Sequence, residues 1–155
     1  MNKEQLIDAV RDYLDEEGFR YEYNAEKNFL KLGFNVKCKL KSVRVFWEFR
    51  EHSYLVYSVA PINADKDNLG EIMKYLTMAN FGLVAGNFEL DCRDGEVRYK
   101  SFVDAEGLEK LSHEVIDRSL DVCLAMMQRY GDGIAALVMG FSDADTEIKK
   151  VEGED

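Results

Sequence analysis

Residues Leu30 to Lys41 read LKLGFNVKCKLK, and this stretch decides the fold. Apolar side chains at the even-numbered positions alternate with lysine, glycine or asparagine at the odd-numbered ones. A period of two residues is typical of a strand that buries one face and leaves the other in water. We therefore predict a long half-buried strand over residues 30–41, with the rest of the chain arranged around it.

Further strand-like segments lie on both sides of this stretch. Phe19 to Tyr23 has the pattern of a short strand, and the polar residues 24–27 are suited to a turn that joins it to residues 30–41. Val43 to Phe49 and Tyr54 to Ala60 are rich in β-branched and aromatic residues and predict a hairpin.

The faces of this hairpin depend on the length of its loop, because a slip of one residue turns every side chain to the other face. We expect a three-residue loop, which buries Trp47 together with Leu55, Tyr57 and Val59. The apolar residues then left on the solvated face are Phe46, Tyr54 and Val56.

A second hairpin is indicated by Asp94-Gly95, a sequence that favours a two-residue type I′ turn between alternating segments. Such a turn fixes the cross-strand partners. The predicted pairs on the polar face are Arg93 with Glu96, Asp91 with Arg98, and Glu89 with Lys100.

Apolar residues at helical spacing predict three helices, over residues 3–17, between Asp65 and Gly82, and over residues 108–130. Gly131-Asp132-Gly133 is expected to interrupt the third helix before a short apolar helical piece that ends at Phe141. The chain is thus predicted to be α+β, an antiparallel sheet packed against helices in the order α-β-β-β-β-α-β-β-α. We expect one domain over residues 1–141 and an acidic C-terminal tail over residues 142–155.

The composition limits the possible partners and the compartment. Thirty acidic and 20 basic residues give a formal charge of -10, which repels nucleic acid and anionic membrane surfaces. No apolar run approaches the roughly 18 residues that span a bilayer. We expect a cytoplasmic protein in which Cys38, Cys92 and Cys123 are buried and reduced.

No catalytic, cofactor-binding or metal-binding motif is complete. His52 and His113 have no second ligand at metal spacing, and no G-x-S-x-G or phosphate-binding loop is present. Asp143, Asp145 and Glu147 imitate the start of a calcium loop, but Ile148 stands where that loop requires glycine. We therefore expect no catalytic residues, no cofactor and no metal, and thus a protein that is not an enzyme.

Two segments resemble the YbjN family of bacterial proteins, which has the fold of type III secretion chaperones. Residues 75–80 (YLTMAN) lead into 86–91 (GNFELD) and 94–99 (DGEVRY), and residues 130–140 (YGDGIAALVMG) precede an acidic segment, as in that family. The resemblance implies an antiparallel sheet against helices, frequent homodimerisation, and a role in sensory transduction regulation or chaperone-like binding. It supplies no catalytic residues.

Two functions are consistent with these observations. The first is a homodimeric protein-binding or regulatory module that holds an unknown protein partner against Phe46, Tyr54 and Val56, unless the C-terminal helix covers these residues. The second is a small-molecule sensor with a pocket between the sheet and the long helix, lined by Trp47 and Tyr99.

Overall fold

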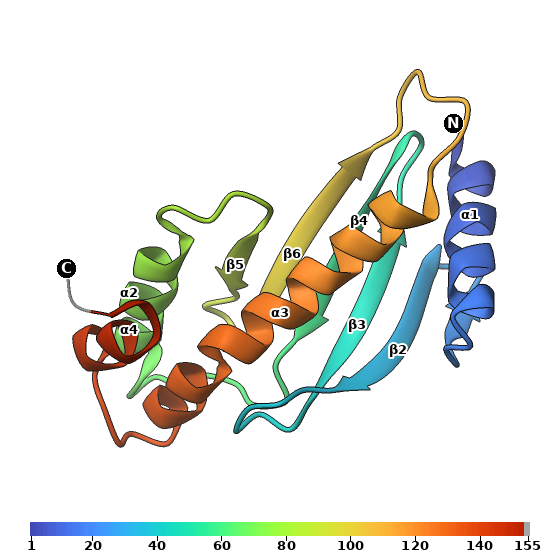
Figure 1. Cartoon of the computed structure of the whole chain (residues 1–155). Helices are drawn as coiled ribbons and strands as arrows, with labels where there is room; N and C mark the ends of the chain where they lie inside the picture. Colours follow the sequence, from blue (N-terminus) through green and yellow to red (C-terminus); the bar gives the residue numbers. More distant parts are fainter. Residues whose placement is uncertain (154–155) are drawn as a thin grey trace.

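The computed structural model describes residues 1–153, which fold into one antiparallel sheet with helices packed against it. The strand order across the sheet is β1-β2-β3-β4-β6-β5 (Figure 1). The elements in chain order are α1 (Lys3–Glu16), β1 (Glu22–Asn24), β2 (Phe29–Asn35), β3 (Ser42–Phe49), β4 (Ser53–Val59), α2 (Leu69–Asn80), β5 (Asn87–Leu90), β6 (Val97–Asp104), α3 (His113–Val138) and α4 (Ala144–Glu152). The α+β class and the predicted order of elements are confirmed, with α4 as an addition.

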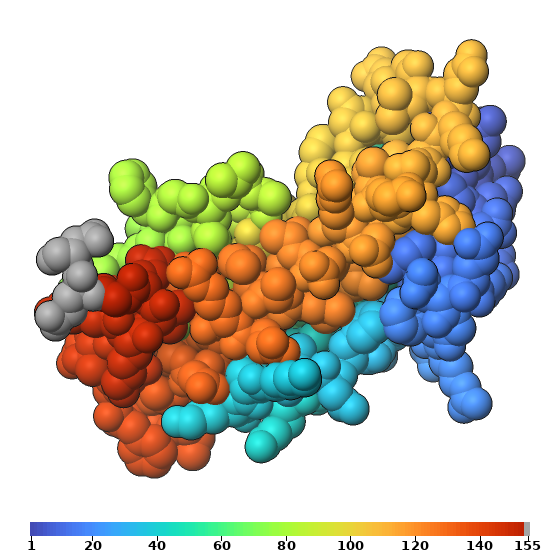
Figure 2. Space-filling model, in the orientation of Figure 1, coloured from blue at the N-terminus to red at the C-terminus, as the bar shows by residue number. Residues whose placement is uncertain are grey.

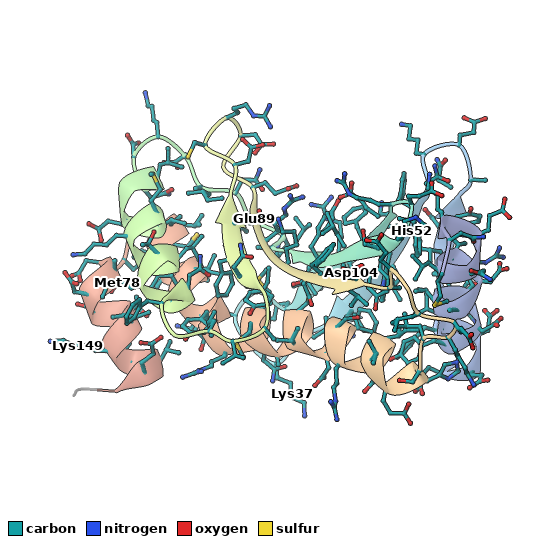
Figure 3. The ribbon with its side chains drawn as sticks, turned by 90° about the horizontal axis from the view of Figure 1, so that it is seen from above. Lys37, His52, Met78, Glu89, Asp104 and Lys149 are labelled. Atoms are coloured by element: carbon teal, nitrogen blue, oxygen red, sulfur yellow. The ribbon has the colours of Figure 1, made fainter. Side chains whose placement is uncertain are left out.

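The helices leave one face of the sheet uncovered. The long helix α3 crosses the sheet, with α1 near one of its ends and α2 and α4 near the other (Figure 1). Seen from above, α3 lies along one side of the sheet, and no described helix lies along the opposite side (Figure 3). The hydrophobic core fills the side that faces α3, where Trp47, Val56 and Tyr99 are fully buried.

The predicted strand over 30–41 ends at Asn35, so the prediction is wrong for residues 36–41. These residues form the loop between β2 and β3, closed by a hydrogen bond from Val36 N to Lys41 O (2.9 Å). The alternation continues through the loop because Leu40 is buried and Cys38 packs against the core, both close to Gly131 of α3. Lys37 N and Lys39 N donate to Gln128 Oε1 and Asp132 Oδ1, which fixes the loop to α3.

The β3–β4 hairpin has a shorter loop than predicted. Arg50 N donates to Ser53 O (2.8 Å), which leaves a two-residue turn, and Trp47 pairs with Val56. This difference of one residue turns β4 over. Tyr54 and Val56 are therefore fully buried beside Trp47, while Leu55 and Tyr57 lie on the face that carries Phe46.

The β5–β6 hairpin has a longer loop than predicted. Gly95 N donates to Asp91 O (2.7 Å), and the pairs are Glu89 with Arg98 and Leu90 with Val97, two residues away from the expected register. A shift of two residues keeps every side chain on its expected face. Gly95 adopts a φ of 81°, and an added Cβ there would overlap the backbone of Ala64.

Helix α3 continues through Gly131 and Gly133, so the predicted interruption is wrong. Both glycines are buried because neighbouring side chains occupy the space of a Cβ: an added Cβ at Gly131 would lie 2.6 Å from Cys38 Sγ, and one at Gly133 would overlap the ring of Tyr75. These glycines are contact points between α3 and its neighbours. The helix begins at His113, later than predicted, with Ser112 as its N-cap.

The segment predicted as an acidic tail contains α4. The side chain of Asp143 accepts a hydrogen bond from Thr146 N (2.8 Å) and begins the helix, which buries Ala144 and Ile148 against the rest of the fold. Glu71 of α2 accepts a hydrogen bond from Ala144 N (2.7 Å). Residues 144–152 therefore form a helix packed on the fold, where the sequence predicts a tail outside the domain, and Glu154 and Asp155 lie outside the described residues.

The three cysteines differ in exposure. Cys123 is buried between α3 and the sheet, and burial raises its pKa to about 12, whereas Cys38 is half-buried. Cys92 is exposed in the β5–β6 loop, so the prediction of three buried cysteines is wrong for this residue.

Candidate functional site: the open sheet face

The uncovered side of the sheet, which we call the open face, is built by alternate residues of its six strands. Directly opposed residues run across it from Lys31 through Phe46 and Tyr57 to Lys100. We define the open face by Glu22, Phe29, Lys31, Arg44, Phe46, Glu48, Leu55, Tyr57, Glu89, Arg98, Lys100, Phe102 and Asp104.

An aromatic row lies at its centre. The rings of Phe46 and Tyr57 are stacked, with centroids 5.5 Å apart and an interplanar angle of 24°, and Phe29 lies 6.2 Å from Phe46. Lys31 Nζ is 6.0 Å from the Phe46 centroid, and the guanidinium of Arg98 lies 4.4 Å above Tyr57. Neighbouring aromatic and cationic side chains support one another in this geometry.

Phe102 extends this apolar surface into solvent. Phe102 lies on β6, directly opposite Leu55 of β4, and 58% of its surface is exposed. No helix of the described residues covers this large apolar side chain, and the half-buried aromatic row lies beside it. Surfaces of this kind mark sites of interaction when they are contiguous.

The charges of the open face differ from those of the whole chain. The face carries four basic residues (Lys31, Arg44, Arg98 and Lys100) and four acidic ones (Glu22, Glu48, Glu89 and Asp104), which gives 4 − 4 = 0, against a formal charge of -10 for the chain. Glu89 accepts hydrogen bonds from Arg98 Nε (2.8 Å) and Lys100 Nζ (2.7 Å). An anionic segment would therefore meet less repulsion on the open face than elsewhere.

We expect Glu89→Gln to lower the free energy of unfolding by about 1 kcal/mol at neutral pH. Burial alone would raise the pKa of Glu89, but the hydrogen bonds and charges of Lys100 and Arg98 outweigh burial and lower it from 4.5. Because the folded pKa is depressed, the carboxylate stabilises the fold above about pH 4.5, and this contribution is lost as the pH falls through the folded value. Urea denaturation of the wild type and Glu89→Gln should be followed from neutral pH to below pH 4.5, and the difference between their free energies of unfolding should become smaller in acid. A difference that does not change with pH would show that Glu89 does not form these ion pairs.

The structure places the predicted site residues on opposite faces. Phe46 lies on the open face, half-buried against Tyr57. Tyr54 and Val56 are fully buried under α3, so their predicted exposure is wrong, because β4 pairs in the other register. The residues missed from the sequence are Leu55, Tyr57 and Phe102. Phe102 could have been found from the alternation that directs Val97, Tyr99 and Ser101 inward.

The space between the sheet and α3, where the sequence suggested a sensor pocket, is filled by side chains. Trp47 and Tyr99 are fully buried there. The hydroxyl of Tyr54 lies 2.7 Å from Ser119 Oγ, and Ser58 Oγ donates to Cys123 O (2.9 Å). A ligand at this position would have to displace these contacts.

The described residues contain neither a cluster of metal-ligating side chains nor a membrane-spanning helix. Across residues 1–153, no three His, Cys, Asp or Glu side chains gather as they would around a metal ion. His113 Nδ1 is 3.0 Å from Glu16 Oε2, and His52 Nδ1 is 2.9 Å from Met1 O. No helix in this part of the chain has the length and apolarity needed to cross a bilayer.

Comparison with known proteins gives structural neighbours only. No protein-family model and no curated protein sequence matches the chain. Among solved structures, it is similar to YbjN from E. coli, a candidate transcription regulator, with a TM-score of 0.60, 13% identity, and coverage of 81% of this chain and 90% of YbjN. It is also similar to a chain of the ExsC–ExsE complex, with a TM-score of 0.55, 16% identity, and coverage of 83% of this chain and 96% of that one. These likenesses, together with the six-stranded antiparallel sheet, show that the chain has the YbjN-like α+β fold.

Proposed function

We propose that this protein is a non-enzymatic, chaperone-like or regulatory protein-binding module that holds a segment of a partner protein on its open face. The observation that carries the proposal is the aromatic row of Phe29, Phe46 and Tyr57, which no described helix covers and which Phe102 extends into solvent. Covering such a surface removes apolar area from water at roughly 25 cal/mol per Å².

The chemistry of the face also indicates the kind of segment that it would hold. Stacked aromatic rings accept apolar side chains, and the flanking Lys31 and Arg44 supply cations that pair with carboxylates. The partner segment would therefore combine apolar and acidic residues. Nucleic acid is a poorer fit because the chain as a whole carries a formal charge of -10.

The structural neighbours support a binding role by analogy of fold. One of them was solved as a complex of two proteins, and the other is a candidate transcription regulator. Because a fold supports many functions, this analogy is weaker than the surface itself. We further propose that the protein acts in the cytoplasm as a homodimer.

The proposal is tested by affinity capture from the source cytosol with the tagged wild-type protein and two variants. Phe102→Ser removes the exposed ring of the open face, and Phe81→Ser removes a ring that is 91% exposed in the loop after α2. Both substitutions change exposed residues, so we expect the free energy of unfolding of each variant to lie within about 0.5 kcal/mol of the wild-type value.

We expect at least one partner protein to be retained by the wild type and by Phe81→Ser, and to be lost or strongly reduced with Phe102→Ser. Truncation of an aromatic side chain that contributes strongly to binding costs more than about 1 kcal/mol of binding free energy, which is about fivefold or more in affinity. Equal recovery with all three proteins would contradict the use of the open face. Sedimentation of Phe102→Ser as a monomer, beside a dimeric wild type, would show that the face is instead the homodimer interface.

A further inference from the structure

A concave surface lies on the α3 side of the sheet, where the C-terminal part of this helix meets α4. It encloses about 800 Å³ and is lined by residues of α3, α4, the β2–β3 loop and the segment after β4. Figure 2 shows α4 (red) beside this end of α3 (orange), on the face of the molecule away from the open face. We call this surface the α3–α4 groove. Its volume is within the range of about 300–1,000 Å³ that is usual for small-molecule sites.

The groove is mainly apolar because α3 presents small residues to it. Gly133, Ala135 and Ala136 form one wall, and Ile62 and Val151 approach from the neighbouring segments. The residues at its rim are large and remain in water: Met139 is 61% exposed and Phe141 is 80% exposed. An apolar ligand in the groove would cover this surface.

The charged residues of the groove are three basic ones, Lys39, Arg129 and Lys150, and two acidic ones, Asp132 and Glu147. Glu147 pairs with the charged Lys150 Nζ (2.8 Å), whereas Asp132 accepts a hydrogen bond from the neutral backbone N of Lys39 (2.7 Å). The groove thus carries 3 − 2 = +1 in a chain of formal charge -10.

Glu147 remains an anion although it is almost fully buried. Burial alone would raise its pKa, but hydrogen bonds from Lys150 and Ser142 and the positive charges of Lys150 and Lys39 lower it. The charge of Glu147 is therefore balanced by Lys150. An incoming anion would meet Lys39 and Arg129 together with Asp132, which leaves a charge of 2 − 1 = +1.

From this arrangement we propose that the α3–α4 groove binds an apolar small molecule that carries one carboxylate group. The apolar part would lie against Ala136 and under Met139 and Phe141, and the carboxylate would lie beside Lys39 and Arg129. A neutral or cationic amphiphile would gain the apolar contact without the charge pairing. The proposal does not depend on the open face, which lies on the other side of the sheet.

The test is calorimetric titration of the full chain with decanoate below its micellar concentration. We expect saturable binding at one site. Ala136→Trp places a large ring in the groove and should abolish it, whereas Val115→Trp, at a position on the same helix that is 40% exposed and outside the groove, should bind as the wild type does.

A second pair of variants tests the charge. Lys39→Gln combined with Arg129→Gln removes two charges from the groove and should weaken decanoate binding about fivefold or more. Lys37→Gln combined with Lys66→Gln removes the same charge outside the groove and should leave binding within about twofold of wild type. Absence of saturable binding, equal binding by Ala136→Trp, or equally tight binding of decyltrimethylammonium would each overturn the proposal.

Discussion

Replacement of Gly133 by alanine is expected to lower the free energy of unfolding by about 3 kcal/mol, although alanine favours helix. An added Cβ would overlap the hydroxyl and ring of Tyr75, and this hydroxyl is held by a hydrogen bond to Tyr130 O (2.9 Å). Tyr75 is fully buried, so its ring has no free space into which to move. Urea denaturation followed by circular dichroism measures the loss.

Gly70→Ala is the matched control. Gly70 lies in the first turn of α2, and an added Cβ there would meet nothing within 4 Å. Alanine should therefore raise stability by about 0.5 kcal/mol, through its helix propensity and the loss of chain freedom in the unfolded state. If Gly133→Ala stabilised the protein as Gly70→Ala does, α3 would not pack against Tyr75 as described.

The second large effect is expected at neighbouring residues of β4. Val56→Asp should lower the free energy of unfolding by about 4 kcal/mol or more. Val56 is fully buried beside Trp47, so an aspartate there would be a buried charge without a partner. Leu55→Asp should cost only about 1 kcal/mol, because Leu55 lies half-buried on the open face. Thermal unfolding of the two variants side by side measures the difference. A greater loss for Leu55→Asp would instead support a three-residue β3–β4 loop, which buries Leu55 on the same face as Trp47.

These predictions follow from the points at which sequence and structure differ. The class and order of elements could be predicted because alternation marks strands and a period of about 3.6 marks helices wherever only one face is buried. On β4 this signal fails: residues 54–57 (YLVY) are apolar on both faces, so only the turn can set the register. Glu51 and His52 have no strong turn preference, and the loop length was therefore predicted one residue too long.

The glycines of α3 show a second limit of sequence reasoning. A glycine in a helical pattern is expected both at a helix end and where another element approaches closely. Tyr75 and Cys38, which approach Gly133 and Gly131, are distant in the sequence, so the pattern could not distinguish the two cases. Contacts with a distant element also explain Cys38 and Leu40. These residues continue the alternation of a strand, but they lie in a loop that hydrogen bonds to α3 hold in place.

The candidate site was predicted only in part. Phe46 lies on the predicted face because β3 alternates clearly. On β4, the predicted loop length places Tyr54 and Val56 on this face, whereas Leu55 and Tyr57 lie there in the structure. The α3–α4 groove could not be predicted, because it depends on α4, which the acidic composition of residues 142–155 hid.

The most direct test of the open face is photo-cross-linking by a partner that has been identified by capture. A benzoylphenylalanine placed at Phe102 lies on the open face, and one placed at Phe81 is a control of comparable exposure in the loop after α2. We predict a covalent product with the partner from position 102 and none from position 81. Cross-linking from position 81 alone would show that the partner binds elsewhere, and the proposed role of the open face would then be wrong.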